Sequence, residues 1–392
     1  MKKLVVWLLA LTMTASLVAC SGSNSTPATT EAPASNEVEE PEASQEAEPA
    51  ETPEDAAPAD SAPAGEFGNT TSGVPTTPTA APEKLKVAFI MGNASMSGSS
   101  VPCAAVEKIC GDFGWEIQTW DGEGDPGKEN EAIMSAISWG AEVILTASVQ
   151  ASNVQSGLQA ATEAGIACGS LSCGTDTPNN VIEAEYNYSF DIGPDYYGLG
   201  QSIGEWIAAN TTGSGKVGCW DFEGEYSIAL CRDGLYDKLK ELNIEYEDNG
   251  CFTFDQLGDT LNRTVSTYLT NNPDTEFLFF PFDPASVPVS EYLDLNGYTD
   301  IKVIGVLGNS EMCALISQGS VASATAAYDN TYMGYAAIDQ ILRVLNGESL
   351  IDPHGENVPY VVIDSSNLPN NEETGWVASF DYAGEYYSLW GK

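Results

Sequence analysis

Length, charge and composition exclude several classes of protein. The chain has 392 residues, with 57 Asp and Glu against 14 Lys and Arg, a formal net charge of −43 and a single histidine. So acidic a chain is repelled by phosphate backbones, which excludes a nucleic-acid partner. Because His354 is the one imidazole, His-rich metal sites are excluded, and a Ser-His-Asp or Cys-His site would have to use that residue. The length predicts two domains with sizeable cores.

The first twenty residues are typical of an export signal. Lys2 and Lys3 precede an apolar stretch over 4–17, which is too short for a bilayer that needs about 20 residues. The stretch ends in Leu-Val-Ala-Cys at 17–20 and resembles a bacterial lipobox, in which the cysteine is acylated and becomes the mature N-terminus. We therefore expect 1–20 to be a lipoprotein signal ending at Cys20, with an ordinary secretory signal as the alternative. The protein is then extracytoplasmic and lipid-anchored to the bacterial cell membrane.

Residues 21–82 have the composition of a disordered linker. They hold twelve acidic residues, ten prolines, no Lys or Arg, and one aromatic residue, Phe67. Such a segment cannot bury enough apolar surface to offset the entropy of ordering it, and proline and charge repulsion keep it extended. We expect a solvated spacer between the membrane and the folded part, with a docking segment as the alternative.

From residue 83 the chain alternates between short apolar strands and amphipathic helices. The Asp125-Pro126 pair is typical of a helix start, with an N-cap followed by proline at the first helical position. Alternation every 25–35 residues predicts parallel sheets covered by helices on both faces, with ligands bound outside the carboxyl ends of the strands. The predicted strands are 84–91, 115–120, 143–147, 166–170, 216–221, 244–252, 277–280, 302–306, 321–327 and 359–363. The predicted helices include one around 104–109 and 126–139, 152–164, 195–210, 227–242, 258–271, 285–296, 310–318 and 330–346.

Residues 84–363 resemble the type I, ribose- and galactose-type, periplasmic substrate-binding proteins of bacterial ABC importers. The resemblance rests on the opening strand and its Asn93 turn, on Asp-Pro-Gly-Lys-Glu at 125–129 and on Ala-Glu-Val-Ile-Leu at 141–145. It rests further on 195–200 before Ile-Gly-Glu-Trp-Ile at 203–207, on 227–236 and on Leu-Arg-Val-Leu-Asn-Gly at 342–347. It implies an α/β fold of two doubly wound parallel-sheet lobes joined by a three-crossing hinge. The first lobe would comprise 83–192 plus 329–355 and the second 193–328 plus 356–364. The two lobes would close on a ligand between them.

The same resemblance suggests where a ligand would bind. Arg232 falls where sugar-binding relatives place an arginine in the cleft, and a guanidinium suits vicinal hydroxyls or a carboxylate. Phe282 and Leu307 stand where relatives often have polar residues, so the site is expected to be more apolar and aromatic than a ribose pocket. The candidate ligand-binding residues are Asn93, Ser95, Met96, Ser172, Cys173, Tyr226, Arg232, Phe282, Asp283 and Tyr328.

Other patterns support no further site. The acidic residues over 121–131 resemble part of an EF-hand loop, but Pro126 stands where glycine is needed and Ala132 where the bidentate Glu is needed. We therefore expect no metal, and no motif indicates a cofactor or a catalytic residue. Eight cysteines remain after Cys20, at 103, 110, 168, 173, 219, 231, 251 and 313, and their pairing stays open because eight thiols allow 105 complete pairings. The aromatic C-terminal extension, 365–392, is expected to pack along the hinge or a lobe, with a partner-docking patch as the alternative.

The sequence thus predicts a monomeric binding protein and no enzyme. It would capture a small solute, a carbohydrate by resemblance, and deliver it to the membrane subunits of an ABC permease. A ligand sensor that presents its closed form to a membrane receptor, and a binding protein for a non-sugar solute, are the alternatives.

Overall fold

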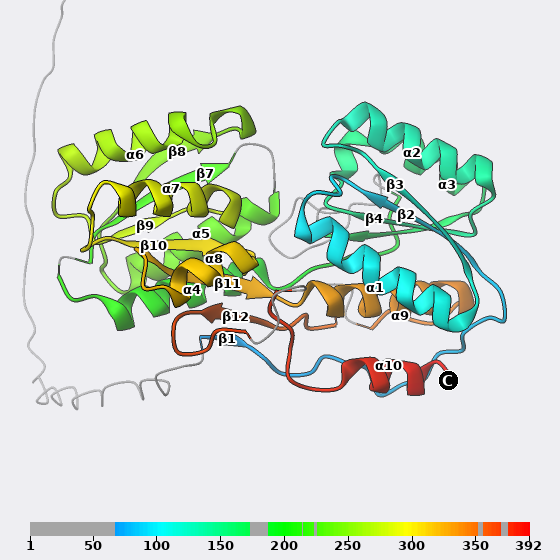
Figure 1. The fold of residues 1–392 in the computed structure, drawn as a ribbon. Coiled ribbons are helices and arrows are strands. Elements are labelled where there is room, and N and C mark those ends of the chain that lie inside the picture. The colour runs from blue at the N-terminus through cyan, green and yellow to red at the C-terminus, as the bar shows by residue number, and fades with distance from the viewer. Residues whose placement is uncertain (1–66, 173–186, 214, 223–225, 352–355, 370–374) are drawn as a thin grey trace, which may run out of the picture. The chain divides into compact units, whose positions relative to one another are not determined.

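The computed structural model describes residues 67–172, 187–213, 215–222, 226–351, 356–369 and 375–392. All of them belong to one compact unit, Asp60–Lys392. Within it two separate sheets form, one of five strands and one of seven (Figure 1). We call the five-stranded sheet with its helices the N-lobe and the seven-stranded sheet with its helices the C-lobe.

The N-lobe sheet is parallel throughout, with the strand order β3-β2-β4-β5-β6. Its strands are β2 Lys86–Met91, β3 Glu116–Asp121, β4 Val143–Ala147, β5 Ala167–Leu171 and β6 Asp191–Ile192. Helices α1 Ser97–Phe113 and α9 Asn330–Asn346 cover one face (Figure 1). The 3-10 turn η1 Ala151–Asn153 and helices α2 Pro126–Trp139 and α3 Gln155–Glu163 cover the other. Since both faces are buried, β4 is apolar along its whole length apart from Thr146.

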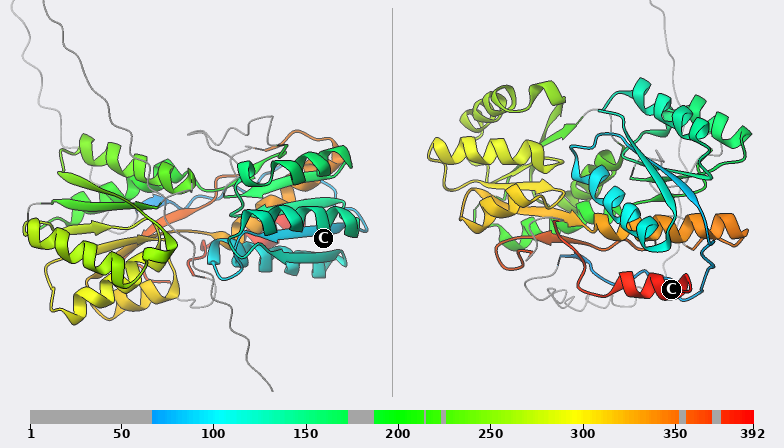
Figure 2. Two further views of the ribbon diagram at one scale, coloured as in Figure 1. Left: turned by 90° about the horizontal axis from the view of Figure 1, so that it is seen from above. Right: turned by 45° about the vertical axis from the view of Figure 1, so that its right-hand side comes forward.

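The C-lobe sheet has the order β1-β12-β11-β10-β9-β7-β8. Its strands are β1 Gly68–Asn69, β7 Val217–Phe222, β8 Tyr246–Phe252, β9 Phe277–Phe279, β10 Lys302–Val306, β11 Ala322–Tyr328 and β12 Tyr360–Ile363. Helices α4 Tyr196–Asn210 and α5 Tyr226–Glu241 lie on one face. The 3-10 turn η3 Phe254–Gln256 and helices α6 Asp259–Asn271, α7 Asp283–Leu295 and α8 Ser310–Ser317 lie on the other side (Figure 2).

Most of these elements lie within two or three residues of their predicted bounds because their local signals agree. Asp125 caps α2 as expected, since its carboxylate accepts hydrogen bonds from the backbone N–H groups of Gly127 and Lys128 at 2.8 and 3.1 Å, with Pro126 in the first turn. The α/β fold of two lobes is confirmed. The C-lobe sheet is not wholly parallel, however, because β12 runs antiparallel to β11 and β1 antiparallel to β12.

The predicted end of the linker at residue 82 is wrong. Residues 67–82 are part of the folded unit, because β1 pairs with β12 and the chain then runs along α9 to the N-lobe. The buried Arg343 donates to the backbone oxygen of Thr77 at 2.7 Å, and the Trp115 indole donates to that of Pro82 at 2.9 Å. Composition did not reveal this because these contacts use backbone groups, which every residue carries.

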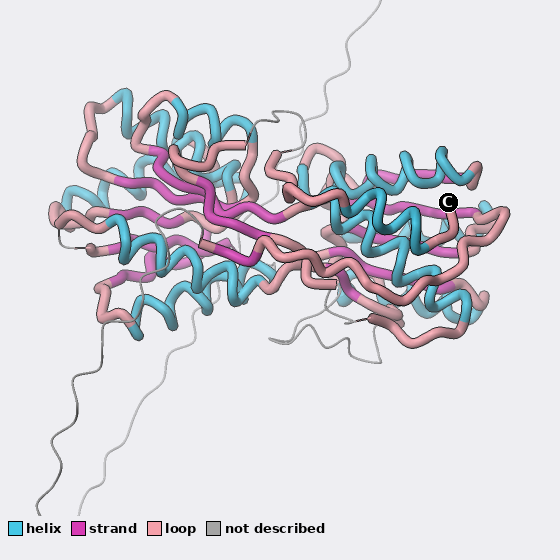
Figure 3. The backbone as a smooth tube through the Cα atoms, turned by 90° about the horizontal axis from the view of Figure 1, so that it is seen from below, coloured by secondary structure: helices cyan, strands magenta, loops and turns pink. Residues whose placement is uncertain are grey.

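The C-terminal extension also crosses from one lobe to the other. After β12, Ala378 donates its N–H to Asp329 at 2.9 Å, and α10 Tyr382–Leu389 packs on α9. Tyr386 and Trp390 are buried against Tyr335. Together with the segment after β1, this gives five connections between the sheets where three were expected. Figure 3 shows loop segments running side by side between them. Among the described helices, none is both long enough and apolar enough to cross a membrane.

Candidate functional site

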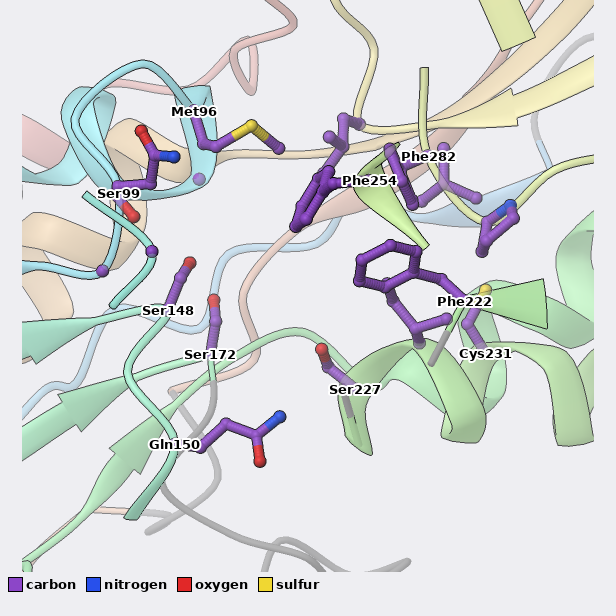
Figure 4. Close-up of a pocket in the computed structure, with 18 of the residues that line it drawn as sticks. Met96, Ser99, Ser148, Gln150, Ser172, Phe222, Ser227, Cys231, Phe254 and Phe282 are labelled. Carbon is purple, nitrogen blue, oxygen red and sulfur yellow. The ribbon is translucent and has the colours of Figure 1, made fainter. Parts of the chain in front are cut away.

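A cavity of about 340 Å³ lies between the two lobes, at the carboxyl ends of their parallel strands. This is the edge of a parallel sheet at which ligands bind. Figure 4 shows the side chains of the two walls facing one another. The described residues that line it are Gly92, Asn93, Met96, Gly98, Ser99, Gly124, Pro126, Glu129, Ser148, Gln150, Asn153, Ser172, Tyr196, Phe222, Ser227, Ile228, Cys231, Thr253, Phe254, Pro281, Phe282, Val306, Leu307 and Tyr328.

The N-lobe wall is mainly polar and uncharged. Ser99, on the first turn of α1, donates its hydroxyl to the backbone oxygen of Ala147 at 3.2 Å. Ser148 and Gln150 follow β4, and Ser172 follows β5. The Ser172 side chain is only 7% exposed, and its hydroxyl has no hydrogen-bond partner among the described residues. A buried polar group without a partner is costly, so a ligand hydroxyl or carbonyl at this place would be stabilised by it.

Three residues that line the cavity hold a backbone conformation that favours glycine. Their φ angles are +55° at Ser148, +80° at Ser172 and +113° at Leu307. Each comes directly after a strand, namely β4, β5 and β10. Side chains at positive φ strain the backbone, and such strain collects at functional sites. The strained positions therefore mark the same edge of the two sheets as the cavity does.

The C-lobe wall is aromatic and apolar. Phe222 ends β7, Phe254 follows β8 and Phe282 follows β9. Their rings pack together, with centroid distances of 4.6 Å between Phe222 and Phe254, 5.0 Å between Phe222 and Phe282, and 6.0 Å between Phe254 and Phe282. Phe222 and Phe282 are buried, whereas Phe254 is 54% exposed and projects from this group into the space facing Met96 (Figure 4).

Five of the predicted residues line the cavity, namely Asn93, Met96, Ser172, Phe282 and Tyr328. Cys173 lies outside the described residues. Ser95 and Tyr226 do not line it. Ser95 instead donates its N–H and hydroxyl to the Asn93 side-chain oxygen at 2.9 and 2.6 Å, which fixes the loop after β2.

Arg232 is not among the described residues that line the cavity, and its contact with a ligand stays a prediction. Its neighbour Cys231 lines the cavity in its place. The Arg232 guanidinium forms an ion pair with Asp221 and binds Asp233 through Nη2 at 2.7 Å and Nε at 3.0 Å. Two carboxylates therefore hold the fork of donors that a ligand would need. Burial raises the pKa of the Cys231 thiol to about 12, so this lining thiol is neutral at ordinary pH.

Asp283 is fully buried and is not among the described residues that line the cavity, and it supports the site from behind. Its carboxyl accepts from the backbone N–H of Asn309 at 2.7 Å and lies 2.9 and 3.1 Å from the hydroxyl of Thr325. These bonds hold the turn that contains the lining residue Leu307. Burial raises the pKa of Asp283 to about 8.

Several lining residues were not predicted, above all Phe222, Phe254, Ser148 and Gln150. Each ends or follows a strand, so the rule that ligands bind at strand ends could have found them. The prediction instead took its positions from relatives, which place other residues there.

The described part of the chain offers neither a metal site nor a disulfide. It contains no group of three or more His, Cys, Asp and Glu that could hold a metal ion. In the acidic loop over 121–131, Asp125 caps α2, and Asp121 accepts from the N–H groups of Ala94 and Glu123 at 3.0 and 2.8 Å. The seven cysteines at 103, 110, 168, 219, 231, 251 and 313 are free thiols.

Two lobes of parallel sheet with a cavity at their strand ends define the type I periplasmic-binding-protein fold. A family model described as periplasmic binding protein domain matches residues 87–349, and the chain belongs to this family. No curated protein matches the sequence.

Solved structures of similar fold include three bacterial proteins. A solute-binding protein of an ABC transporter from Mycobacterium smegmatis, with bound glycerol, is 22% identical at a TM-score of 0.62, over 72% of this chain and 95% of that one. A solute-binding protein of an ABC transporter from Agrobacterium vitis, bound with α-D-tagatopyranose, is 16% identical at a TM-score of 0.63, over 73% of this chain and 96% of that one. A periplasmic ribose ABC transporter protein from Conexibacter woesei is 18% identical at a TM-score of 0.64, over 74% of this chain and 94% of that one.

Proposed function

We propose that the protein is an extracytoplasmic binding lipoprotein that captures a small carbohydrate in the cavity between its lobes. The observation that carries this proposal is the cavity of about 340 Å³ at the strand ends, with hydroxyl and carboxamide groups on one wall and aromatic rings on the other. Hydroxyls and carboxamides both donate and accept hydrogen bonds, as sugar hydroxyls do, and aromatic rings pack on apolar faces. Structures of the same fold hold glycerol and tagatopyranose, which supports a polyhydroxyl ligand.

We infer that the protein binds its solute without chemical conversion. Glycoside hydrolysis commonly uses two carboxylates that flank the bond to be cleaved. Among the described residues that line the cavity, Glu129 is the one acidic side chain. The lining therefore favours recognition over acid–base catalysis.

Export, anchoring and delivery complete the proposal. The signal and lipobox cysteine, Cys20, lie outside the described residues, so these steps rest on the sequence alone. Acylation of Cys20 would hold the protein at the membrane, and the acidic segment before residue 67 would let the lobes reach the permease subunits of an ABC transporter. The permease and its ATPase would be separate chains, and the binding protein would act as a monomer.

A thermal-shift screen of residues 21–392, the mature chain without Cys20, tests the capture of a carbohydrate. The panel holds pentoses, hexoses, polyols, glycosides, nucleosides and amino acids. A ligand at a hundred times its Kd stabilises the native state by about 2.7 kcal/mol, enough to move the melting temperature by degrees. A response to carbohydrates that Ser172→Ala weakens supports the function and the cavity together. A response only to amino acids would contradict the proposed ligand class.

Localisation and transport need separate tests. Cys20→Ala should move the protein from the membrane fraction to the soluble fraction of its host. Deletion of the gene should abolish uptake of the solute identified in the screen, and unchanged uptake would contradict delivery to a permease.

A further inference from the structure

The two walls of the cavity differ so much in chemistry that they suggest a ligand with two different halves. We propose that the ligand is a neutral glycoside, a sugar ring joined to a planar, apolar group. The sugar would lie against the N-lobe wall and the apolar group against the C-lobe wall. This inference rests on the proposed function, because it specifies the carbohydrate that the same cavity takes.

The N-lobe wall can satisfy a sugar ring by hydrogen bonds. Ser148, Gln150, Asn153 and Ser172 contribute hydroxyl and carboxamide groups from the loops after β4 and β5. All four side chains are uncharged and can both donate and accept. Of these groups, the Ser172 hydroxyl gives the strongest reason to expect a hydrogen bond with the sugar, because it is buried and has no partner in the described structure.

The C-lobe wall is less suited to a second hydroxylated face. Its described lining offers the side-chain hydroxyls of Tyr196, Ser227, Thr253 and Tyr328, and its other side chains are apolar. A free monosaccharide carries hydroxyls around its whole ring, and those turned toward the phenylalanine and aliphatic side chains of this wall would lose water without gaining partners, which lowers affinity. The apolar lining here consists of Phe222, Ile228, Cys231, Phe254, Pro281, Phe282, Val306 and Leu307.

Phe254 gives the apolar wall an open surface for a ring. More than half of its side chain is exposed although it contacts Phe222 and Phe282, and it projects toward Met96 on the opposite lobe (Figure 4). Aromatic rings prefer offset-stacked or edge-to-face partners, and Phe254 has its outer side available for one. The cavity volume of about 340 Å³ lies at the lower end of the range of about 300–1,000 Å³ that is typical of ligand pockets.

The charges of the lining residues restrict the charge that the ligand can carry. No Lys, Arg or His is among the described residues that line the cavity, and Glu129 is one of them. A phosphorylated or carboxylated ligand would enter without a counter-charge and near a carboxylate, which is unfavourable. The apolar group is therefore an uncharged ring, and either a nucleobase or a phenyl-type aglycone has this chemistry.

Titration calorimetry of the mature chain with matched pairs tests the inference. The pairs are glucose with phenyl glucoside, galactose with phenyl galactoside, and ribose with adenosine and uridine. In at least one pair we expect the conjugate to bind tenfold or more tighter than the free sugar, which is about 1.4 kcal/mol. A phenyl glycoside as the tightest ligand would identify an aryl glycoside, and adenosine or uridine would identify a nucleoside.

Two variants and a control assign the halves of the ligand to the two walls. Phe254→Ala should abolish the advantage of the conjugate and leave the affinity for the free sugar within about threefold, whereas Ser172→Ala should weaken both members of the pair. Leu295→Ala removes a side chain that is 87% exposed and does not line the cavity, and it should change neither. Melting temperatures show that each variant is folded.

Two outcomes would overturn the inference in different ways. If a free sugar binds as tightly as its conjugate, or if Phe254→Ala weakens both alike, the carbohydrate-binding function stands and the glycoside inference is wrong. If neither sugars nor conjugates bind, the proposed function fails with it.

Discussion

Replacement of Asp283 by Asn should remove a large part of the pH dependence of stability. The carboxyl is fully buried beneath the turn after β10, and burial raises its pKa from 3.8 to about 8. The native state therefore keeps the proton up to about pH 8, whereas the unfolded chain releases it from about pH 4. Between these values the unfolded state binds fewer protons, so stability falls as pH rises. Full stability from this group is present below pH 3.8.

The size of the effect follows from the same pKa values. Each pH unit within this window costs the wild-type native state about 1.4 kcal/mol, so the loss between pH 5 and pH 7 is about 3 kcal/mol. Asn has the same shape as a protonated Asp. Its oxygen can accept from the N–H of Asn309 and its amide can donate to the hydroxyl of Thr325, so the two proteins should be about equally stable below about pH 4, where Asp283 is protonated in both states. At pH 7 the variant should be more stable by about 4 kcal/mol, of which about 3 kcal/mol builds up between pH 5 and pH 7.

Urea unfolding followed by tryptophan fluorescence at pH 5, 6 and 7 measures this difference. Asp329→Asn is the matched control, because Asp329 is also buried but its pKa is raised only to about 6. The gain in free energy of unfolding of Asp329→Asn over the wild type should therefore stop increasing with pH above about pH 6. If the Asp283→Asn difference stays constant from pH 5 to pH 7, Asp283 is ionised in the native protein and the reasoning is wrong.

Substitutions at three further residues test the site and the C-terminal extension. Arg232→Ala should leave solute affinity within about threefold in calorimetry and lower the free energy of unfolding by about 3 kcal/mol, because the buried Asp221 loses its partner. A tenfold loss of affinity would indicate that Arg232 contacts the ligand. Trp390→Ala should cost about 3–5 kcal/mol in urea unfolding, because the ring is buried on α9, while the exposed Leu295→Ala changes stability by less than about 0.5 kcal/mol. Ser172→Gly and Ser172→Ala should weaken binding equally, but only Gly should be at least as stable as the wild type, because it suits a φ of +80°. Equal stability of the two variants would show that the strain is negligible.

Sequence alone predicts elements whose signals are local. The strand Val143–Ala147 has its predicted bounds because five residues that are apolar apart from Thr146 lie between two helices. The strands β1 and β6 were not predicted, since each has only two residues and no periodicity can show in so short a segment. The helix α10 was likewise seen only as an aromatic run, although that run was expected to pack on the hinge or a lobe.

Side-chain partners across elements are what the sequence does not show. Arg232 is on α5 and Asp221 on β7, and only the fold brings them together as an ion pair. Asp283 was a candidate ligand-binding carboxylate because relatives of the family it resembles keep an Asp at this place. Its direction depends on Thr325 and Asn309, which come from a neighbouring strand and turn. A residue's place at a strand end can be predicted, whereas the side to which it points cannot.

The strained backbone connects the support of the site with its chemistry. Leu307 has a φ of +113°, which a residue with a side chain holds only where its surroundings fix it. The N–H of Leu307 donates to the backbone oxygen of Ala326 at 2.8 Å, and the N–H of Gly308 donates to the Thr325 hydroxyl at 3.1 Å. The N–H of the next residue, Asn309, donates to the Asp283 carboxyl. Glycine would fit this backbone with less strain, but it would remove an apolar side chain from the C-lobe wall. The buried carboxyl of Asp283 therefore stabilises a turn whose strained residue, Leu307, presents apolar surface to the ligand. Because this carboxyl is buried behind the site, its raised pKa makes the native protein less stable as the pH rises above about 4.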